Sequence, residues 1–170
     1  MKKVIDEILK AYSKIKDENF SLLEDKILKS EKIFVYGTGR SGFIGKCFCM
    51  RLFHLGFNSY FVGETITPKF TKNDLIIFIS ATGEKSTSLG IAELCKKERG
   101  KILTITSNKN SKLAKISDFL IIIPVEKSIQ FGNSLFEQVC FLFLEIFIQR
   151  FIEKNMIKEN FIEKRHTNLE

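Results

Sequence analysis

Two segments rich in glycine and hydroxyl side chains each follow an apolar, strand-like run. Residues 37–42 read GTGRSG after KIFVY, and residues 80–87 read SATGEKST at the end of LIIFIS. Backbone N–H groups at helix starts and Ser or Thr hydroxyls can together bind a phosphate monoester without a metal ion. The candidate donors are Ser41, Ser80, Thr82 and Thr87, with Arg40 or Lys85 to balance the charge. Helix capping alone would explain one such segment, but two converging segments favour a phosphate site.

Nucleotide binding is the first alternative, because glycine-rich turns after strands also hold nucleotides. No lysine follows these glycines at the spacing of a P-loop, G-x-x-x-x-G-K-[ST], which excludes that kind of site. Residues 37–42 do match the dinucleotide pattern G-x-G-x-x-G, and Glu64 lies near the position of the acid that holds ribose hydroxyls. A dinucleotide site does not need the second hydroxyl-rich segment, so a phosphomonoester accounts better for both.

The sequence alone favours structural roles for three other ionisable residues. Glu137 lies in SLFEQ, at the start of a long helical pattern, where the sequence alone favours a role as an acid that stabilises the helix dipole. His166 lies in the polar tail RHTNLE, and His54 lies in MRLFHLGF, where a helix-surface or subunit-contact histidine is favoured. No cluster of His, Cys and carboxylate residues has metal-ligand spacing. Neither a metal nor a cofactor is therefore predicted.

The elements that must position these residues alternate between strands and helices. Runs rich in β-branched and aromatic residues predict strands at 32–36, 59–62, 75–80, 101–106 and 119–123. Apolar spacing predicts helices at 1–29 with room for one break, 41–55, 86–98, 110–117, and from 132 onward. The stretch GETITPKFTKND between the second and third strands is expected to be a loop.

Apolar strands separated by helices predict an α/β fold with a parallel sheet covered on both faces. Five strands with right-handed crossovers favour the flavodoxin-like order 2-1-3-4-5. In that order the first and third strands are neighbours, so segments 37–42 and 80–87 meet at the topological switch point. Open α/β sheets bind their ligands at this point.

The chain of 170 residues fits a single domain. We divide it into an N-terminal helical segment (1–30), an α/β core (31–131) and C-terminal helices with a tail (132–170). The net charge of +7 comes from lysines scattered among acids, so no nucleic-acid partner is expected. The start lacks a signal peptide and no apolar stretch reaches the length of a membrane span, which predicts a cytoplasmic protein with no membrane partner. The four cysteines lack C-x-x-C spacing and are expected to be free thiols.

Four motifs carry a family resemblance over nearly the whole chain. In order, they are GTGRSGFIGKCFCMRLFHLGFNSYFVGETITP, ISATGE, GNSLFEQ and RHTNLE. Together they closely resemble the 6-phospho-3-hexuloisomerases, which consist of a single sugar isomerase (SIS) domain. The resemblance implies the five-stranded α/β fold, a homotetramer, and interconversion of D-arabino-hex-3-ulose 6-phosphate and fructose 6-phosphate. That reaction serves formaldehyde fixation by the ribulose monophosphate pathway, or pentose phosphate supply.

The resemblance also implies roles for individual residues. It places the base that works through a 2,3-enediol at Glu137, and it lets His166 reach a neighbouring subunit's site to assist ring opening or oxygen protonation. Lys85 stands where SIS loops usually have threonine, so an ammonium would replace a hydroxyl donor there. The substrate-binding residues would be Gly39, Arg40, Ser41, Ser80, Ala81, Thr82, Gly83, Glu84, Lys85 and Thr87.

Two other functions stay open at this point. Another SIS aldose–ketose isomerase, such as one acting on arabinose 5-phosphate, would use a similar domain, although many carry extra domains downstream. A non-catalytic SIS domain that senses sugar phosphates would normally follow a helix-turn-helix domain, and only about 30 residues precede the first strand here. A substrate panel followed by proton NMR would separate these functions.

Overall fold

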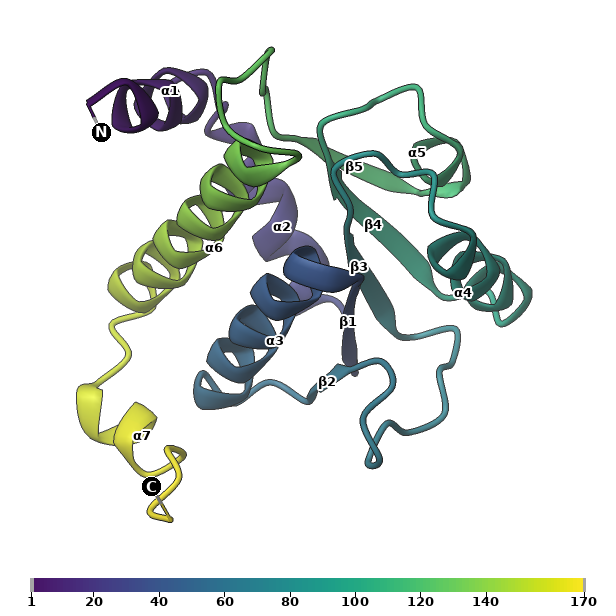
Figure 1. The fold of residues 1–170 in the computed structure, drawn as a ribbon. Coiled ribbons are helices and arrows are strands. Elements are labelled where there is room, and N and C mark those ends of the chain that lie inside the picture. The colour runs from purple at the N-terminus through teal and green to yellow at the C-terminus, as the bar shows by residue number, and fades with distance from the viewer. Residues whose placement is uncertain (1, 170) are drawn as a thin grey trace.

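A five-stranded parallel sheet runs through the centre of the protein (Figure 1). The computed structural model describes residues 2–169. The strands are β1 (Ile33–Gly37), β2 (Ser59–Phe61), β3 (Leu75–Ile79), β4 (Lys101–Thr106) and β5 (Phe119–Ile122). They lie in the order β2-β1-β3-β4-β5, and all neighbouring pairs are parallel. The predicted flavodoxin-like order is therefore confirmed.

Helices connect the strands and extend both ends of the chain. They are α1 (Lys2–Tyr12), α2 (Glu18–Leu28), α3 (Gly39–His54), α4 (Ser86–Lys97), α5 (Lys112–Ile116), α6 (Ser134–Lys154) and α7 (Glu159–Glu163). The N-terminal helix has the one break for which its pattern left room, at residues 13–17. Helix α3 begins at Gly39, two residues earlier than predicted, because the glycine-rich turn itself forms the first helical turn.

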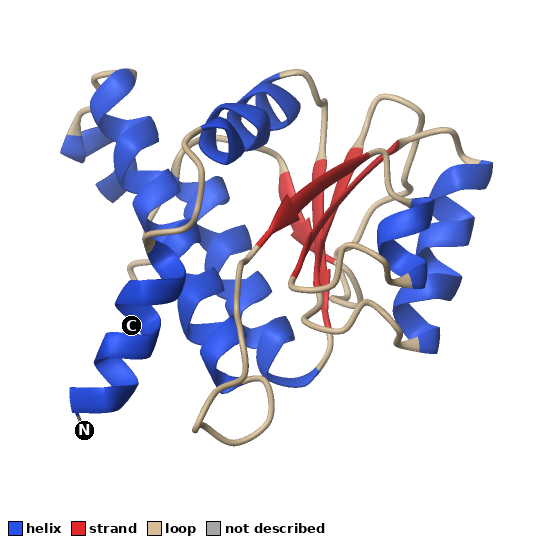
Figure 2. Cartoon of the chain, turned by 90° about the horizontal axis from the view of Figure 1, so that it is seen from above, coloured by secondary structure: helices blue, strands red, loops and turns tan. Residues whose placement is uncertain are grey.

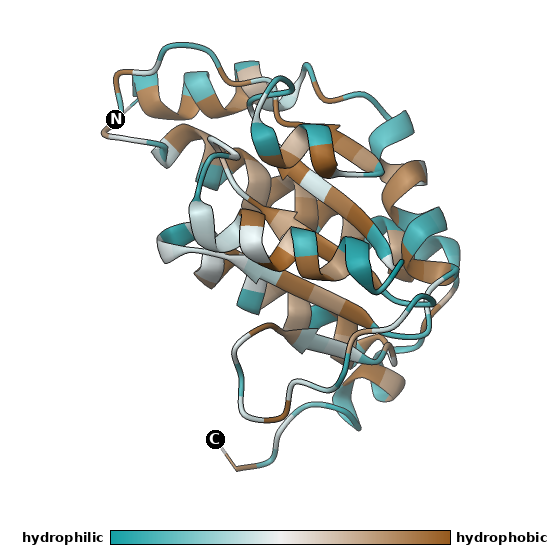
Figure 3. Cartoon of the chain, turned by 90° about the vertical axis from the view of Figure 1, so that its right-hand side faces the viewer, coloured by the Kyte–Doolittle hydropathy of each residue, from teal (hydrophilic) through white to brown (hydrophobic). Residues whose placement is uncertain are grey.

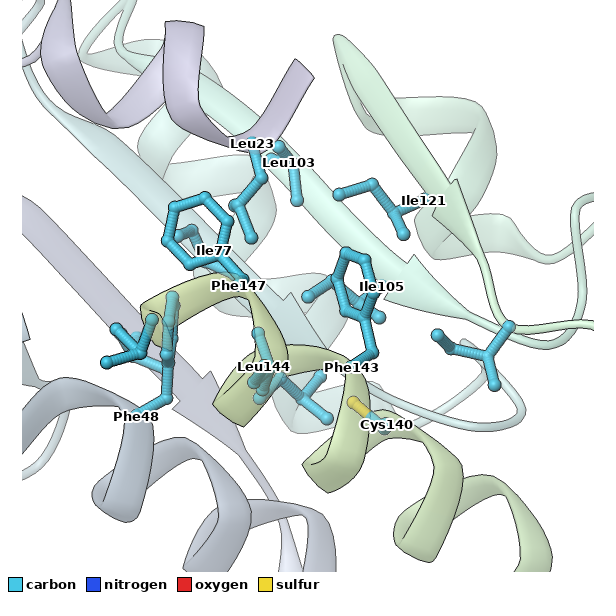
Figure 4. Packing of buried hydrophobic residues seen from close by; sticks show 14 of the residues in the cluster. Leu23, Phe48, Ile77, Leu103, Ile105, Ile121, Cys140, Phe143, Leu144 and Phe147 are labelled. Carbon is cyan, nitrogen blue, oxygen red and sulfur yellow. The ribbon is translucent and has the colours of Figure 1, made fainter. Parts of the chain in front are cut away.

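The two faces of the sheet are covered by different helices, as Figure 2 shows when the sheet is seen on edge. Alternate strand residues point to opposite faces. Ile77, Leu103 and Ile105 pack with α1, α2, α3 and α6 in the larger core cluster, and Figure 4 shows them beside Phe143 and Phe147 of α6. A smaller cluster on the other face packs β-strand residues against α4 and α5.

The strands are apolar along most of their length, whereas the helices carry apolar and polar residues on different sides (Figure 3). All five residues of β3 are buried, as expected for the central strand of a parallel sheet covered on both faces. The rigid middle of the sheet therefore fixes the ends of β1 and β3, where the predicted phosphate segments begin. Among the helices of residues 2–169, none is long and apolar enough to cross a membrane.

Candidate active site

The two predicted phosphate segments meet at one edge of the sheet. Strands β1 and β3 pair in register, with Gly37 beside Ile79, so the chain leaves both strands at the same level. The first turn of α6 lies at the same edge, and together the three segments enclose a cleft of about 460 Å³. The residues that line it are Thr38, Ser41, Ser80, Ala81, Thr82, Glu84, Lys85, Asn133 and Glu137.

The turn from β1 into α3 is tight enough to require glycine. A Cβ on Gly42 would lie 2.6 Å from the carbonyl oxygen of Gly37, and a Cβ on Gly37 would lie 2.8 Å from the backbone of Ser41. Gly39 has a φ of +56°, a conformation that glycine adopts without strain. This close approach brings Ser41 to the wall of the cleft at the N-terminal end of α3, where helix N–H groups and the helix dipole favour an anion.

The second loop, residues 80–85, is held by contacts within itself and with β4 and α5. Gly83 N–H donates to the Ser80 hydroxyl at 3.2 Å, and the Gly83 carbonyl accepts from Leu113 N–H at 3.0 Å. The Ala81 carbonyl accepts from the hydroxyls of Thr106 at 3.0 Å and Ser107 at 2.8 Å. Because the Ser80 oxygen accepts a hydrogen bond in this arrangement, its own O–H proton stays available to a ligand in the cleft.

Two predicted ligand residues of this segment have different surroundings from the rest. Glu84 accepts a hydrogen bond from Lys112 N–H at 3.0 Å and lies 3.5 Å from the Lys112 ammonium, so its carboxylate helps to fix the loop to α5. Thr87 is exposed in the first turn of α4 and is not among the residues that line the cleft. Lys85 does line the cleft, at the N-cap position of α4.

Glu137 lies in the first turn of α6, with its carboxylate at the cleft and only 11% of its side chain exposed. Arg40 Nε donates to Glu137 Oε2, which links the two sequence-predicted residues across 97 positions of the chain. From the sequence, Arg40 is expected to balance the charge of a bound phosphate, and Glu64 is considered as an acid for ribose hydroxyls. In the structure Glu64 pairs with Lys46 at 2.8 Å.

Cys140 lies three residues beyond Glu137 on α6 and is fully buried. Burial, and secondarily the negative charge of Glu137, raises the pKa of this thiol. Cys140 therefore stays protonated near neutral pH and does not compete with Glu137 as a base. Asn133, at the N-cap position of α6, also lines the cleft and was not predicted as a site residue, because its sequence signal was only that of a helix start.

His166 is not brought to the cleft of its own chain. Its ring lies 4.9 Å from the ring of His54, centroid to centroid, at the last residue of α3. The cleft is at the other end of α3, and a 16-residue helix is about 24 Å long. Arg165 fixes this part of the tail, since its Nε donates to the Phe53 carbonyl at 2.7 Å. A role for His166 in catalysis therefore requires a second copy of the chain.

His54 is buried, and its Nδ1 has no hydrogen-bond partner among the described residues. Burial lowers the pKa of His54 below its ordinary value of 6.5, and the nearby charges of His166, Arg51 and Arg165 lower it further. The imidazole is therefore neutral at physiological pH. It lies outside the residues that line the cleft.

Comparison with known proteins agrees with this geometry. The SIS domain model matches residues 26–142. The 3-hexulose-6-phosphate isomerase of Methanocaldococcus jannaschii is 42% identical over 149 residues, covering 86% of this chain and 82% of that protein. The enzyme of the same name from Bacillus subtilis is 35% identical over 176 residues, covering 98% of this chain and 95% of that protein.

A solved structure extends the likeness to three dimensions. A crystal structure from Methanococcus jannaschii, from which the function of a 3-hexulose-6-phosphate isomerase was inferred, superposes with a TM-score of 0.90 at 38% identity. The match covers 99% of this chain and 98% of that one. 3-Hexulose-6-phosphate isomerase is another name for 6-phospho-3-hexuloisomerase, so the resemblance found in the motifs is confirmed. The chain belongs to the SIS domain family and, within it, to the enzymes named 3-hexulose-6-phosphate isomerases.

Proposed function

We propose that this protein interconverts D-arabino-hex-3-ulose 6-phosphate and fructose 6-phosphate, with Glu137 as the base. The observation that carries the proposal is the position of a mostly buried carboxylate in the same cleft as two loops suited to phosphate. The names of the relatives support this substrate pair. A cleft of about 460 Å³ also falls within the range of roughly 300–1,000 Å³ that is usual for small-molecule sites.

The phosphate would bind where the two loops meet. Ser41 and Ser80 present hydroxyls there, Thr82 lines the same wall, and Lys85 brings a positive charge to the start of α4. The N-terminal ends of α3 and α4 both point to this region, and helix N-termini favour anions. Such a site can bind a phosphate without a metal ion.

The reaction moves a carbonyl group between C3 and C2 through a 2,3-enediol. Glu137 would take the proton from C2 of the 3-ulose, and the C2–H electron pair would form the C2=C3 bond while the C3 oxygen gains a proton. Glu137 would then return its proton to C3 as the C2 hydroxyl loses its own proton and becomes the carbonyl. One carboxylate on one face of the substrate can serve both steps, and general acid–base catalysis of this kind contributes roughly 10²–10⁴-fold.

The oxygen protons need a second group, and we assign His166 of a neighbouring copy to them. This assignment is supported by the position of His166 at the far end of α3 from its own cleft. It fits the homotetramer that the resemblance implies, and we propose a cytoplasmic location, as expected from the sequence pattern. The activity would serve carbohydrate metabolism, in the ribulose monophosphate pathway of formaldehyde fixation or in pentose phosphate supply.

Glu137→Gln tests the proposal, because it keeps the shape of the side chain and removes the base. We expect the variant to fold and to be stabilised by fructose 6-phosphate in a thermal-shift titration, since a ligand that binds only the folded state raises its stability. The variant should lose isomerisation by roughly 10²–10⁴-fold. It should also lose the exchange of the C2 and C3 protons with deuterated solvent, followed by proton NMR.

Glu145→Gln is the matched control. Glu145 lies on the same helix, two turns beyond Glu137, and its carboxylate is 3.8 Å from Arg51 rather than in the cleft. The control should keep both activities near the wild-type rate. If Glu137→Gln kept proton exchange at the rate of this control, Glu137 would have only a structural role and the proposed mechanism would be wrong.

A further inference from the structure

The ion pair between Arg40 and Glu137 joins a fixed residue to a movable one. Glu137 is held in the first turn of α6 with 11% of its side chain exposed, whereas 66% of the Arg40 side chain is exposed. Arg40 is the second residue of α3 and directly precedes Ser41, which lines the cleft. The guanidinium can therefore swing on a long side chain while the carboxylate stays in place.

The charges of the cleft require a cation that can reach a bound phosphate. Among the residues that line the cleft, Glu84 and Glu137 contribute two negative charges and Lys85 contributes one positive charge. A phosphate monoester adds between one and two further negative charges near neutral pH. Lys112 on α5 pairs with Glu84 and Arg40 on α3 pairs with Glu137, and neither cation is itself among the residues that line the cleft. Arg40 directly precedes Ser41 of the cleft wall, so it is the cation on the α3 side that can offset the added charge.

The same ion pair has a chemical consequence for the base. A carboxylate oxygen that accepts a hydrogen bond from a guanidinium has that lone pair occupied and its negative charge compensated. The lone pair that accepts this hydrogen bond cannot at the same time take a proton from carbon. If Glu137 is to act as the base through Oε2, the guanidinium has to leave that lone pair before the proton is transferred.

We propose that Arg40 alternates between two anions, pairing with Glu137 until a phosphosugar enters and then with its phosphate, which frees Glu137 to take the C2 proton. Phosphate binding would in this way turn on the base only when substrate is in the cleft. The inference rests on the proposed function of Glu137 and adds a second role to the Arg40 ion pair. The alternative is that Arg40 only ties α3 to α6.

Arg40→Met separates these possibilities through the kinetic constants. In the variant the phosphate loses a charged partner, so KM for fructose 6-phosphate should rise by roughly 10–100-fold, the range for one hydrogen bond between charged groups. Glu137 is not paired with residue 40 in the variant, nor in the proposed wild-type complex with substrate. The kcat of the variant should therefore stay within about threefold of the wild-type value. Arg40→Lys, which keeps the charge, should recover part of the loss in KM.

Arg51→Met is the matched control, because Arg51 also extends from α3 to a glutamate of α6, at 3.8 Å, but outside the cleft. The control should leave KM and kcat unchanged. Equal effects of Arg40→Met and Arg51→Met would show that Arg40 only connects α3 to α6. A fall in kcat with unchanged KM would show that Arg40 stays on Glu137 during catalysis, and either result would overturn the proposal.

Binding of inorganic phosphate gives a test that does not need activity. Titration calorimetry should show phosphate binding to the wild-type protein and to Arg51→Met, and binding at least about tenfold weaker to Arg40→Met. If the wild-type protein lacked isomerase activity but showed this difference, the proposed reaction would fail while the phosphate contact of Arg40 stood. Unchanged phosphate binding in Arg40→Met would refute the exchange directly.

Discussion

Replacing Gly83 with alanine would disturb the second loop of the cleft, residues 80–85, at the point where it passes α5. Gly83 has a φ of +67°, and an L-residue in this left-handed region costs about 1–2 kcal/mol. An added Cβ would also lie 2.6 Å from the Cβ of Ser111 and closer still to its hydroxyl oxygen. That hydroxyl is the N-cap of α5 and accepts from Ala114 N–H at 3.2 Å.

The cost of Gly83→Ala can be worked from these contacts. Moving the Ser111 hydroxyl away breaks the helix cap, which is worth about 0.5–2 kcal/mol. Together with the backbone strain, the free energy of unfolding should fall by about 1.5–4 kcal/mol. Because domains of this kind have a total stability of about 5–15 kcal/mol, the variant should still fold. Its KM for fructose 6-phosphate should rise, since the loop carries Ser80 and Thr82 to the cleft.

Ser111→Gly provides the test of this reasoning by a double-mutant cycle. Glycine is itself an acceptable N-cap, so the single variant should lose only a few tenths of a kcal/mol. With Ser111 reduced to glycine, the nearest remaining atom to the new Cβ is the Leu113 Cβ at 3.6 Å, an ordinary van der Waals contact. Gly83→Ala should then cost only its backbone strain, about 1–2 kcal/mol.

Urea unfolding of the four proteins, analysed with a common slope, measures the cycle. The two sites should be coupled by about 0.5–2 kcal/mol, the part of the cost that comes from the displaced Ser111 cap. An equal cost of Gly83→Ala in both backgrounds would refute the close approach of Gly83 to Ser111 as the reason that this loop needs glycine. The loop would then be held mainly by its other hydrogen bonds.

Two further predictions concern pH and metal ions. The pKa of His54 is lowered below 6.5 in the folded protein. As the pH falls below about 6.5, the unfolded chain therefore takes up a proton at His54 before the folded chain does. The free energy of unfolding should decrease with falling pH in that range. His54→Gln should flatten this part of the curve of unfolding free energy against pH, and an unchanged slope would contradict the assignment. Isomerase activity should survive incubation with EDTA, as expected when loop donors and protein charges stabilise the enediol; loss of activity that a divalent ion restores would contradict it.

The order of the sheet could be predicted because each strand carries its own signal. Runs such as KIFVY and LIIFIS are apolar on both faces, which only a covered parallel strand explains. Right-handed crossovers then leave few possible orders. The meeting of segments 37–42 and 80–87 followed from that order, and the structure shows both at one cleft.

The pairing of side chains could not be predicted in the same way. Arg40 and Glu137 are 97 positions apart, and the spacing of apolar residues shows which face a helix buries but not which charge meets which. The same limit applies to Lys46, which pairs with Glu64, and to Glu84, which is turned toward α5. Hydrogen bonds of this kind depend on the final distance between elements, and the sequence pattern carries no information about it.

The cleft combines a fixed framework with a few side chains that can respond to a ligand. A turn with no room for a Cβ at Gly37 or Gly42 closes one loop, and hydrogen bonds from Leu113 and Thr106 hold the other, so their N–H groups and hydroxyls are fixed in position. Glu137 is fixed by the first turn of a 21-residue helix. In the proposed mechanism, fixed donors and a fixed base would give the proton transfer its geometry, and the exposed cation Arg40 would couple binding to catalysis.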